Sequence, residues 1–101
     1  MDVILHTFFV DFAHIVGQHW SPYPVGSQFA AGSVYEINFL IHETMARYDT
    51  VTWRDGSWRI TKTFPYITGW NYDGPAPRPC YRLQVYYNEE ENVIRTAFPM
   101  V

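Results

Sequence analysis

Cysteine is nearly missing from this chain of 101 residues, because Cys80 is the only one. An intramolecular disulfide framework is therefore excluded, and packing alone must hold the fold together. Long apolar runs are missing as well. The stretch 3–16 is interrupted by His6, Asp11 and His14, so we expect no transmembrane helix. No Lys or Arg precedes this stretch, so we do not expect it to be a signal peptide.

Positive charge is absent from residues 1–46, which contain four carboxylates and neither Lys nor Arg. Residues 47–88 contain six cationic side chains against three Asp, a net charge of +3 for that stretch. The whole chain has a net charge of −3, which disfavours indiscriminate electrostatic binding to nucleic acid. An anion that binds this protein should therefore bind to its second half.

Aromatic residues are abundant, at 19% of the chain, whereas charged residues make up only 17%. So many rings can supply the buried apolar surface that folding requires, which excludes a disordered chain. The length suits one compact core and not two. We therefore expect a single domain over residues 1–101.

Two stretches of the first half have helical spacing. Apolar residues at 5, 8, 9, 12, 13 and 16 form one stripe, which Gly17 should end. Ser33 followed by Glu36 is a capping box that should begin a second helix. Its apolar face contains Val34, Ile37, Ile41, Thr44, Met45 and Tyr48. Residues 21–31 between the two helices should form a loop.

The second half has the alternation of strands. Asp55-Gly56 between residues 51–53 and 57–63 is a strong hairpin signal. Residues 69–79, rich in Pro and Gly, form the longest predicted loop, and residues 80–87 and 93–98 form a closing hairpin. The sequence therefore predicts an α+β fold, with two N-terminal helices packed on an antiparallel sheet of four or so strands.

The closing hairpin contains a predicted polar cluster. A three-residue turn at residues 89–91 would place Tyr86 opposite Ile94, Gln84 opposite Thr96 and Arg82 opposite Phe98. Arg82, Gln84, Tyr86 and Thr96 would then share one face, with Leu83, Val85, Val93 and Ala97 facing the core. This assignment depends on the register, and the alternative interpretation is a solvated sheet face.

His14 and His19 are the candidates for proton transfer, because two histidines can give and take a proton near neutral pH. On a continuous helix their side chains would point about 140° apart. They could converge only if the helix ended near Gly17. The alternative is a capping or partly buried structural histidine. No recognised zinc spacing occurs, so we expect no metal and no cofactor.

The end of the chain resembles a known family. Residues 81–87 and the segment Val93-Ile94-Arg95-Thr96-Ala97-Phe98-Pro99 resemble the closing hairpin of bacterial ribonuclease toxin domains, the group that joins barnase, EndoU, colicin and RelE-type nucleases. His14-Ile15 and His19 resemble the paired-histidine region of the first helix. The stretches 26–29 and 67–74 resemble the loops before the second helix and the final hairpin. A lysine that this group often has near Gln28 is missing here.

This resemblance implies cleavage of RNA without a metal, in which a base activates a ribose 2′-OH to attack the adjacent phosphate. His19 would be the first choice and His14 the second for base or acid. Thr96 would donate to the phosphate, Arg82 would supply positive charge, and Tyr86 would stack a base or contact phosphate. The further candidates for RNA binding are Arg54, Arg59, Arg78 and Gln84.

The resemblance also implies a biological setting. The protein would be a toxin delivered by the producing bacterium and acting in the cytoplasm of a target cell, on tRNA or another structured RNA. A cognate immunity protein would bind and block it, and no membrane partner is expected. The alternative from a different class is a non-catalytic, aromatic-rich interaction or adaptor domain with the same fold.

Overall fold

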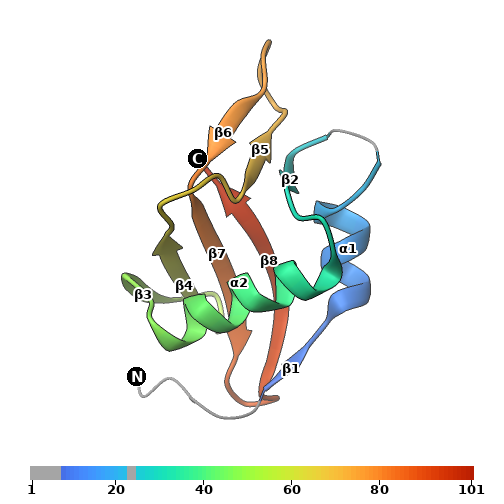
Figure 1. Ribbon diagram of the computed structural model, residues 1–101. Coiled ribbons are helices and arrows are strands. Elements are labelled where there is room, and N and C mark those ends of the chain that lie inside the picture. The colour runs from blue at the N-terminus through green and yellow to red at the C-terminus, as the bar shows by residue number, and fades with distance from the viewer. Residues whose placement is uncertain (1–7, 23–24) are drawn as a thin grey trace.

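The computed structural model describes residues 8–22 and 25–101 (Figure 1). Its elements confirm the α+β class. In chain order they are β1 (Phe9–Val10), α1 (Phe12–His19), β2 (Ser27–Phe29), α2 (Val34–Ala46), β3 (Thr50–Arg54), β4 (Ser57–Thr63), β5 (Gly69–Asn71), β6 (Arg78–Cys80), β7 (Arg82–Asn88) and β8 (Val93–Met100).

The sheet arrangement differs from the expected single antiparallel sheet. A five-stranded sheet has the order β1-β8-β7-β4-β3 and is mixed, because β1 runs parallel to β8. A second, three-stranded sheet has the order β2-β5-β6. The predicted loops 21–31 and 69–79 thus contain strands. At Gly69 of β5, a side chain would collide with the carbonyl of Gln28 and the ring of Pro99, so only glycine allows this close approach.

The first helix begins later than predicted, and each helix follows a short strand. Asp11 caps α1 by accepting the backbone N–H of His14, while the preceding residues pair with β8. Gly17 lies inside the helix, which continues to His19, so the expected end at Gly17 was wrong. Leu5 of the predicted stripe lies outside the described residues.

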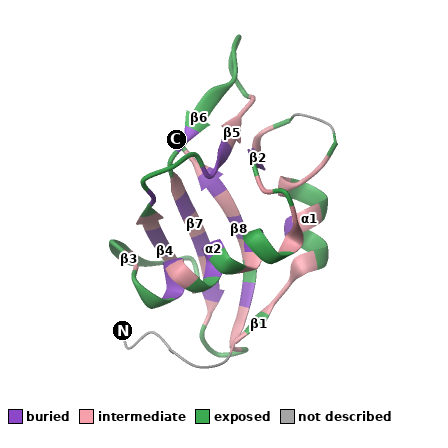
Figure 2. Ribbon diagram, viewed as in Figure 1, coloured by how far each residue is buried: buried purple, intermediate pink, exposed green. Residues whose placement is uncertain are grey.

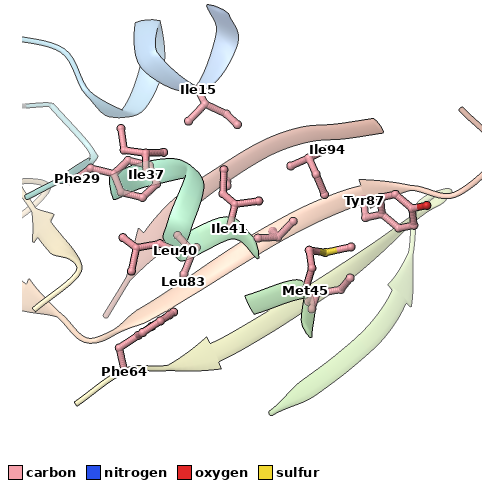
Figure 3. Packing of buried hydrophobic residues seen from close by; sticks show 13 residues of the cluster. Ile15, Phe29, Ile37, Leu40, Ile41, Met45, Phe64, Leu83, Tyr87 and Ile94 are labelled. Atoms are coloured by element: carbon pink, nitrogen blue, oxygen red, sulfur yellow. The ribbon is translucent and has the colours of Figure 1, made fainter. Parts of the chain in front are cut away.

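The capping box of α2 is confirmed. The Ser33 hydroxyl accepts the N–H of Glu36, whose carboxylate accepts the N–H of Gly32. The inward side of the helix is purple and the outward side green in Figure 2. Its buried residues are Ile37, Leu40, Ile41, Thr44 and Met45. Figure 3 shows the apolar ones, Ile37, Leu40, Ile41 and Met45, packed with Leu83, Tyr87 and Ile94 of the long strands.

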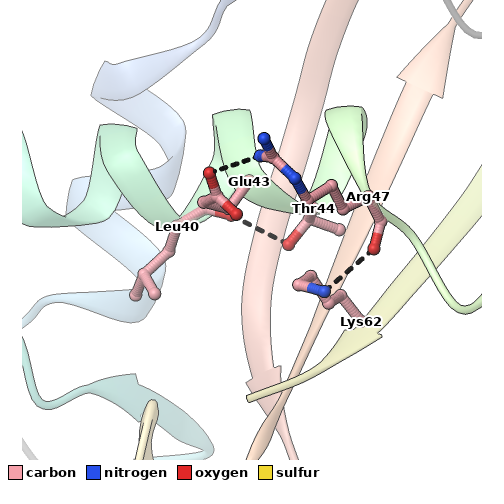
Figure 4. Close-up of polar contacts among 5 residues, drawn as sticks. All are labelled: Leu40, Glu43, Thr44, Arg47 and Lys62. Carbon is pink, nitrogen blue, oxygen red and sulfur yellow. Dashed lines mark hydrogen bonds and ion pairs between the residues drawn. The ribbon is translucent and has the colours of Figure 1, made fainter. Parts of the chain in front are cut away.

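The only lysine of the chain fastens the end of α2 to the sheet. Lys62 of β4 donates to the backbone carbonyl of Arg47, which caps the helix, at 2.9 Å (Figure 4). Arg47 in turn pairs with Glu43 one turn earlier, at 2.8 Å. A cation at a helix C-terminus satisfies a carbonyl that has no partner within the helix. Lys62 is thereby engaged in a structural contact.

Both predicted hairpins are present, but the register of the second differs. Asp55 and Gly56 have φ values of 51° and 81°, as the tight turn between β3 and β4 requires. The last turn contains four residues instead of three, and one extra residue follows in β8, so that Tyr86 lies opposite Thr96 and Gln84 opposite Phe98. Arg82 lies opposite Met100 instead of Phe98.

An irregularity in β8 changes which side of the sheet its first residues face, so the predicted faces of this strand need correction. Tyr87 pairs with Ile94 and Tyr86 with Thr96, which leaves Arg95 as an extra residue, a β-bulge. Ile94 is therefore fully buried, contrary to the predicted place opposite Tyr86, and Val93 is only partly buried. Beyond the bulge, Thr96 shares a face with Tyr86, as predicted.

Candidate functional site

The candidate site lies on the face of the five-stranded sheet opposite α2, here called the outer face. Alternate residues of three adjacent strands point to it, and the strand pairing sets them side by side. Arg59 of β4 lies opposite Tyr86 of β7, and Tyr86 lies opposite Thr96 of β8. In the next row, Thr61 lies opposite Gln84, and Gln84 lies opposite Phe98.

A continuous row of side chains crosses this face to α1. The Arg59 guanidinium carbon lies 3.8 Å from the ring centroid of Tyr86, a cation–π contact. The Tyr86 and Phe98 ring centroids are 5.5 Å apart, and those of Phe98 and His19 are 5.2 Å apart. His14 lies beyond, with its ring centroid 6.4 Å from that of His19. We call these five side chains the ring row.

The two histidines approach each other although both lie on α1. We expected their convergence only if the helix ended near Gly17 and His19 lay on the following loop, whereas His19 belongs to the helix. His19 is the last residue of the helix and is partly buried, whereas His14 is exposed. Their rings meet nearly edge to face, at 69°. Helix α1 therefore presents an exposed imidazole from its first turn, His14, and a partly buried imidazole from its last residue, His19.

His19 is fixed in one tautomer. Its Nδ1 lies 2.9 Å from the backbone carbonyl oxygen of Ser27. A carbonyl oxygen can only accept, so Nδ1 must hold the proton and Nε2 is the basic nitrogen of the neutral ring. Burial lowers the pKa of His19 below its ordinary value, and the nearby His14 lowers it further, against the opposing effect of the Ser27 carbonyl. At neutral pH, His19 is therefore a neutral imidazole that is able to accept a proton.

Thr96 has an unsatisfied hydroxyl beside this row. Its Oγ1 is buried and has no hydrogen-bond partner among the described residues. Buried hydroxyls are nearly always paired, so this exception needs an explanation. In this conformation Oγ1 is covered, and a ligand atom reaches it only after a neighbouring side chain moves aside.

The predicted cations are distributed unequally. Arg59 belongs to the ring row, and its guanidinium lies 3.9 Å from the Asp55 carboxylate. Arg54 lies at the end of β3 and pairs with the same carboxylate at 3.6 Å. Arg82 shares the outer face with Thr96 but donates to the backbone carbonyl of Val101. Arg78 lies on β6, in the other sheet.

Two amides that the sequence singled out have structural partners. Gln84 donates to the Thr61 hydroxyl at 3.3 Å on the outer face. Gln28 is 7% exposed, and its carboxamide accepts from the backbone N–H of Ser21 and donates to the carbonyls of Gln18 and Val25. Gln28 thus occupies the region of the missing lysine, but its side chain stabilises the loop between α1 and β2.

Two members of the site were not identified from the sequence. Phe98 joins His19 to Tyr86, and its place two residues after Thr96 on one strand was a usable signal. Ser27 acts through its backbone carbonyl, which every residue type provides, so no sequence pattern indicates it. The central place of Arg59 depends on the pairing of β4 with β7, two strands that are not consecutive.

Neither a metal cluster nor a membrane span is found in the described part of the chain. No group of three or more His, Cys, Asp or Glu within residues 8–22 and 25–101 is arranged to hold a metal ion. No helix in those ranges is long and apolar enough to cross a membrane. Comparison with protein-family models, with curated proteins and with solved structures finds no match.

Proposed function

We propose that this protein is an endoribonuclease toxin that cleaves RNA without a metal ion. The observation that supports this most directly is the state of His19. A partly buried imidazole with a lowered pKa, its Nδ1 engaged by the Ser27 carbonyl, is suited to act as a general base. The ring row then links this base to the guanidinium of Arg59, on a face where the Thr96 hydroxyl has no hydrogen-bond partner in the described part of the chain.

The proposed reaction uses these groups in sequence. His19 Nε2 takes the proton of a ribose 2′-OH, and the 2′-oxygen attacks the adjacent phosphorus. The bond to the 5′-oxygen breaks, and His14 supplies the proton that the leaving oxygen needs. Arg59 offsets the charge that develops on the phosphate, and Thr96 donates to it once the side chains that cover Oγ1 move aside. Because the attacking group is the 2′-OH, DNA cannot be a substrate.

The wider setting remains part of the proposal. The substrate would be tRNA or another structured RNA in the cytoplasm of a target cell, and a cognate immunity protein would neutralise the toxin. Arg82 and Gln84 extend the outer face beyond the ring row, and Arg54 extends it towards the β3–β4 turn. These side chains would contact the RNA backbone, whereas Arg78, in the second sheet, would contact a distal part of it.

The test is incubation of the purified full chain with total tRNA, with and without EDTA. We expect cleavage that persists in EDTA and leaves 2′,3′-cyclic phosphate ends, and no cleavage of a strand whose target riboses are 2′-deoxy. Cleavage abolished by EDTA and restored by zinc would overturn the metal-free mechanism. Intact tRNA at every enzyme concentration would overturn the proposed activity.

A second candidate, a non-catalytic interaction domain, is favoured by a different surface. Tyr35 and Phe39 on the outward side of α2 are 81% and 54% exposed, and Tyr66 is 46% exposed. Phe39, Tyr66 and Ile67 line a pocket of 260 Å³. Exposed aromatic patches commonly mark protein interfaces. Expression of the chain without a partner distinguishes the two candidates, because the enzyme should be toxic to cells and the interaction domain harmless.

A further inference from the structure

A second hollow with aromatic walls lies beside the ring row and is formed by the segment that follows α1, by β2 and by the residue after β5. It measures 460 Å³ and is lined by Trp20, Ser21, Pro22, Gln28, Phe29 and Tyr72. We call it the aromatic pocket. Among the described residues that line it, three are aromatic and none is charged, so the pocket favours a flat neutral ring over an anionic group.

Hydrogen bonds hold the walls of this pocket in place. The Trp20 indole N–H donates to the carbonyl of Ala31 at 3.1 Å. The backbone N–H of Tyr72 donates to the carbonyl of Gly26 at 2.8 Å. The Gln28 carboxamide makes three hydrogen bonds to the surrounding backbone. The pocket is therefore formed before any ligand arrives, which lowers the entropic cost of binding.

The pocket adjoins the candidate base. Trp20 directly follows His19 in the chain, and a smaller pocket of 280 Å³ contains both His19 and Ser27. The two pockets share Ser21 and Gln28. A nucleotide whose phosphate lies at His19 thus has a neighbouring base within reach of the aromatic walls.

We propose that the aromatic pocket binds one unpaired nucleobase of the RNA. This inference rests on the proposed function, and it specifies the substrate as a loop or single-stranded segment, because a paired base cannot enter a pocket without leaving its helix. Stacking on aromatic side chains tolerates every base, since each base has a flat face. Loss of one stacking ring should weaken binding on the order of 10-fold.

The first experiment follows binding without cleavage. Adenosine and cytidine 5′-monophosphates contain no bond that the enzyme can cut, and ribose 5-phosphate is the same molecule without its base. In NMR titrations of the ¹⁵N-labelled full chain, we expect both nucleotides to shift three signals: the Trp20 indole N–H, the Ser21 backbone N–H and the Gln28 side-chain amide. Ribose 5-phosphate should leave these signals in place. Equal shifts with ribose 5-phosphate, or no shifts with either nucleotide, would overturn the inference.

The second experiment uses variants of the pocket. Tyr72→Leu keeps an apolar wall but removes the ring, and should weaken nucleotide binding about 10-fold. Tyr72→Phe should restore it, which separates stacking from loss of folding. Trp53→Leu is the matched control, because Trp53 is 54% exposed on β3 and lies outside the pocket. Unchanged nucleotide affinity in Tyr72→Leu would overturn the inference.

These results separate the pocket from the proposed activity. Nucleotide binding at the pocket together with intact tRNA would support base binding and overturn the ribonuclease. Cleavage of tRNA with the same KM in Tyr72→Leu as in the unaltered chain would support the ribonuclease and overturn the pocket.

Discussion

The two faces of the five-stranded sheet are built from the same strands and differ in almost every physical respect. The face under α2 is aliphatic and fully buried at Ile60, Leu83, Val85 and Ala97. The outer face presents the residues that alternate with them, among them Arg59, Tyr86 and Phe98, which are partly exposed. One residue along a strand therefore separates a position that stabilises the fold from one that is free to bind. Substitutions at neighbouring positions should affect different measurements.

The largest effect is expected at His19. His19→Ala removes the proposed base, so tRNA cleavage should fall on the order of 10²–10⁴-fold while the melting temperature changes little. His42→Ala is the matched control, because His42 lies on α2, contacts the Phe8 ring and is exposed. If His19→Ala unfolds the protein, or cleaves as fast as His42→Ala, His19 has only a structural role.

Substitutions on the face under α2 should lower the stability of the fold. Leu83→Ala removes a fully buried side chain beneath α2 and should lower the free energy of unfolding by about 2–5 kcal/mol. The next residue provides the control: Gln84→Ala loses a single hydrogen bond to Thr61 and should cost about 1 kcal/mol. Urea denaturation measures both. Equal losses at the two positions would show that the faces do not differ as described.

Much of this contrast between the faces could be predicted from the sequence, because it depends on alternation within single strands. The faces of Leu83, Val85 and Tyr86 follow from the period of two, and the start of α2 follows from Ser33 and its capping box. Such signals act over a few residues, so a chain can be interpreted locally without knowledge of its tertiary contacts.

The rest depends on contacts between distant segments. The order of strands places Arg59 beside Tyr86, and the bulge at Arg95 shifts the register of β8. The start of α1 was also predicted wrongly, because Phe9 and Val10 pair with β8 instead of continuing the helical stripe. Tertiary pairing overrode a local apolar pattern there. The Ser27 carbonyl that orients His19 leaves no trace in the sequence.

Thr96 tests whether the outer face does more than remain solvated. Thr96→Val keeps the branched shape and removes a buried hydroxyl that has no hydrogen-bond partner within residues 8–22 and 25–101, so stability should be unchanged or increase. If the hydroxyl donates to the phosphate, cleavage should fall on the order of 10²–10³-fold. Thermal melts and tRNA cleavage measure the two effects. Thr61→Val is the control, because Thr61 occupies the same face in the Gln84 row. Full cleavage by Thr96→Val would remove Thr96 from the site.

The smallest effect concerns pH and the two histidines. The pKa of His19 is lowered, so the unfolded chain binds a proton at His19 more readily than the folded chain does. The contribution of His19 to stability is therefore complete above 6.5, the ordinary pKa, and is lost as the pH falls through the lowered value. Cleavage should fall over the same acidic range, because a protonated His19 cannot act as the base. His14→Gln removes the proposed acid, so it should lower the rate at every pH. It also removes a neighbouring charge that helps to lower the pKa of His19, so the acidic limb of the remaining activity should move to higher pH. An NMR titration of the His19 ring should show that His14→Gln raises the pKa of His19. The pKa of His19 should be unchanged in the control variant His42→Gln. If the pKa of His19 rises in His14→Gln but the acidic limb of the rate profile stays where it is, another group acts as the base.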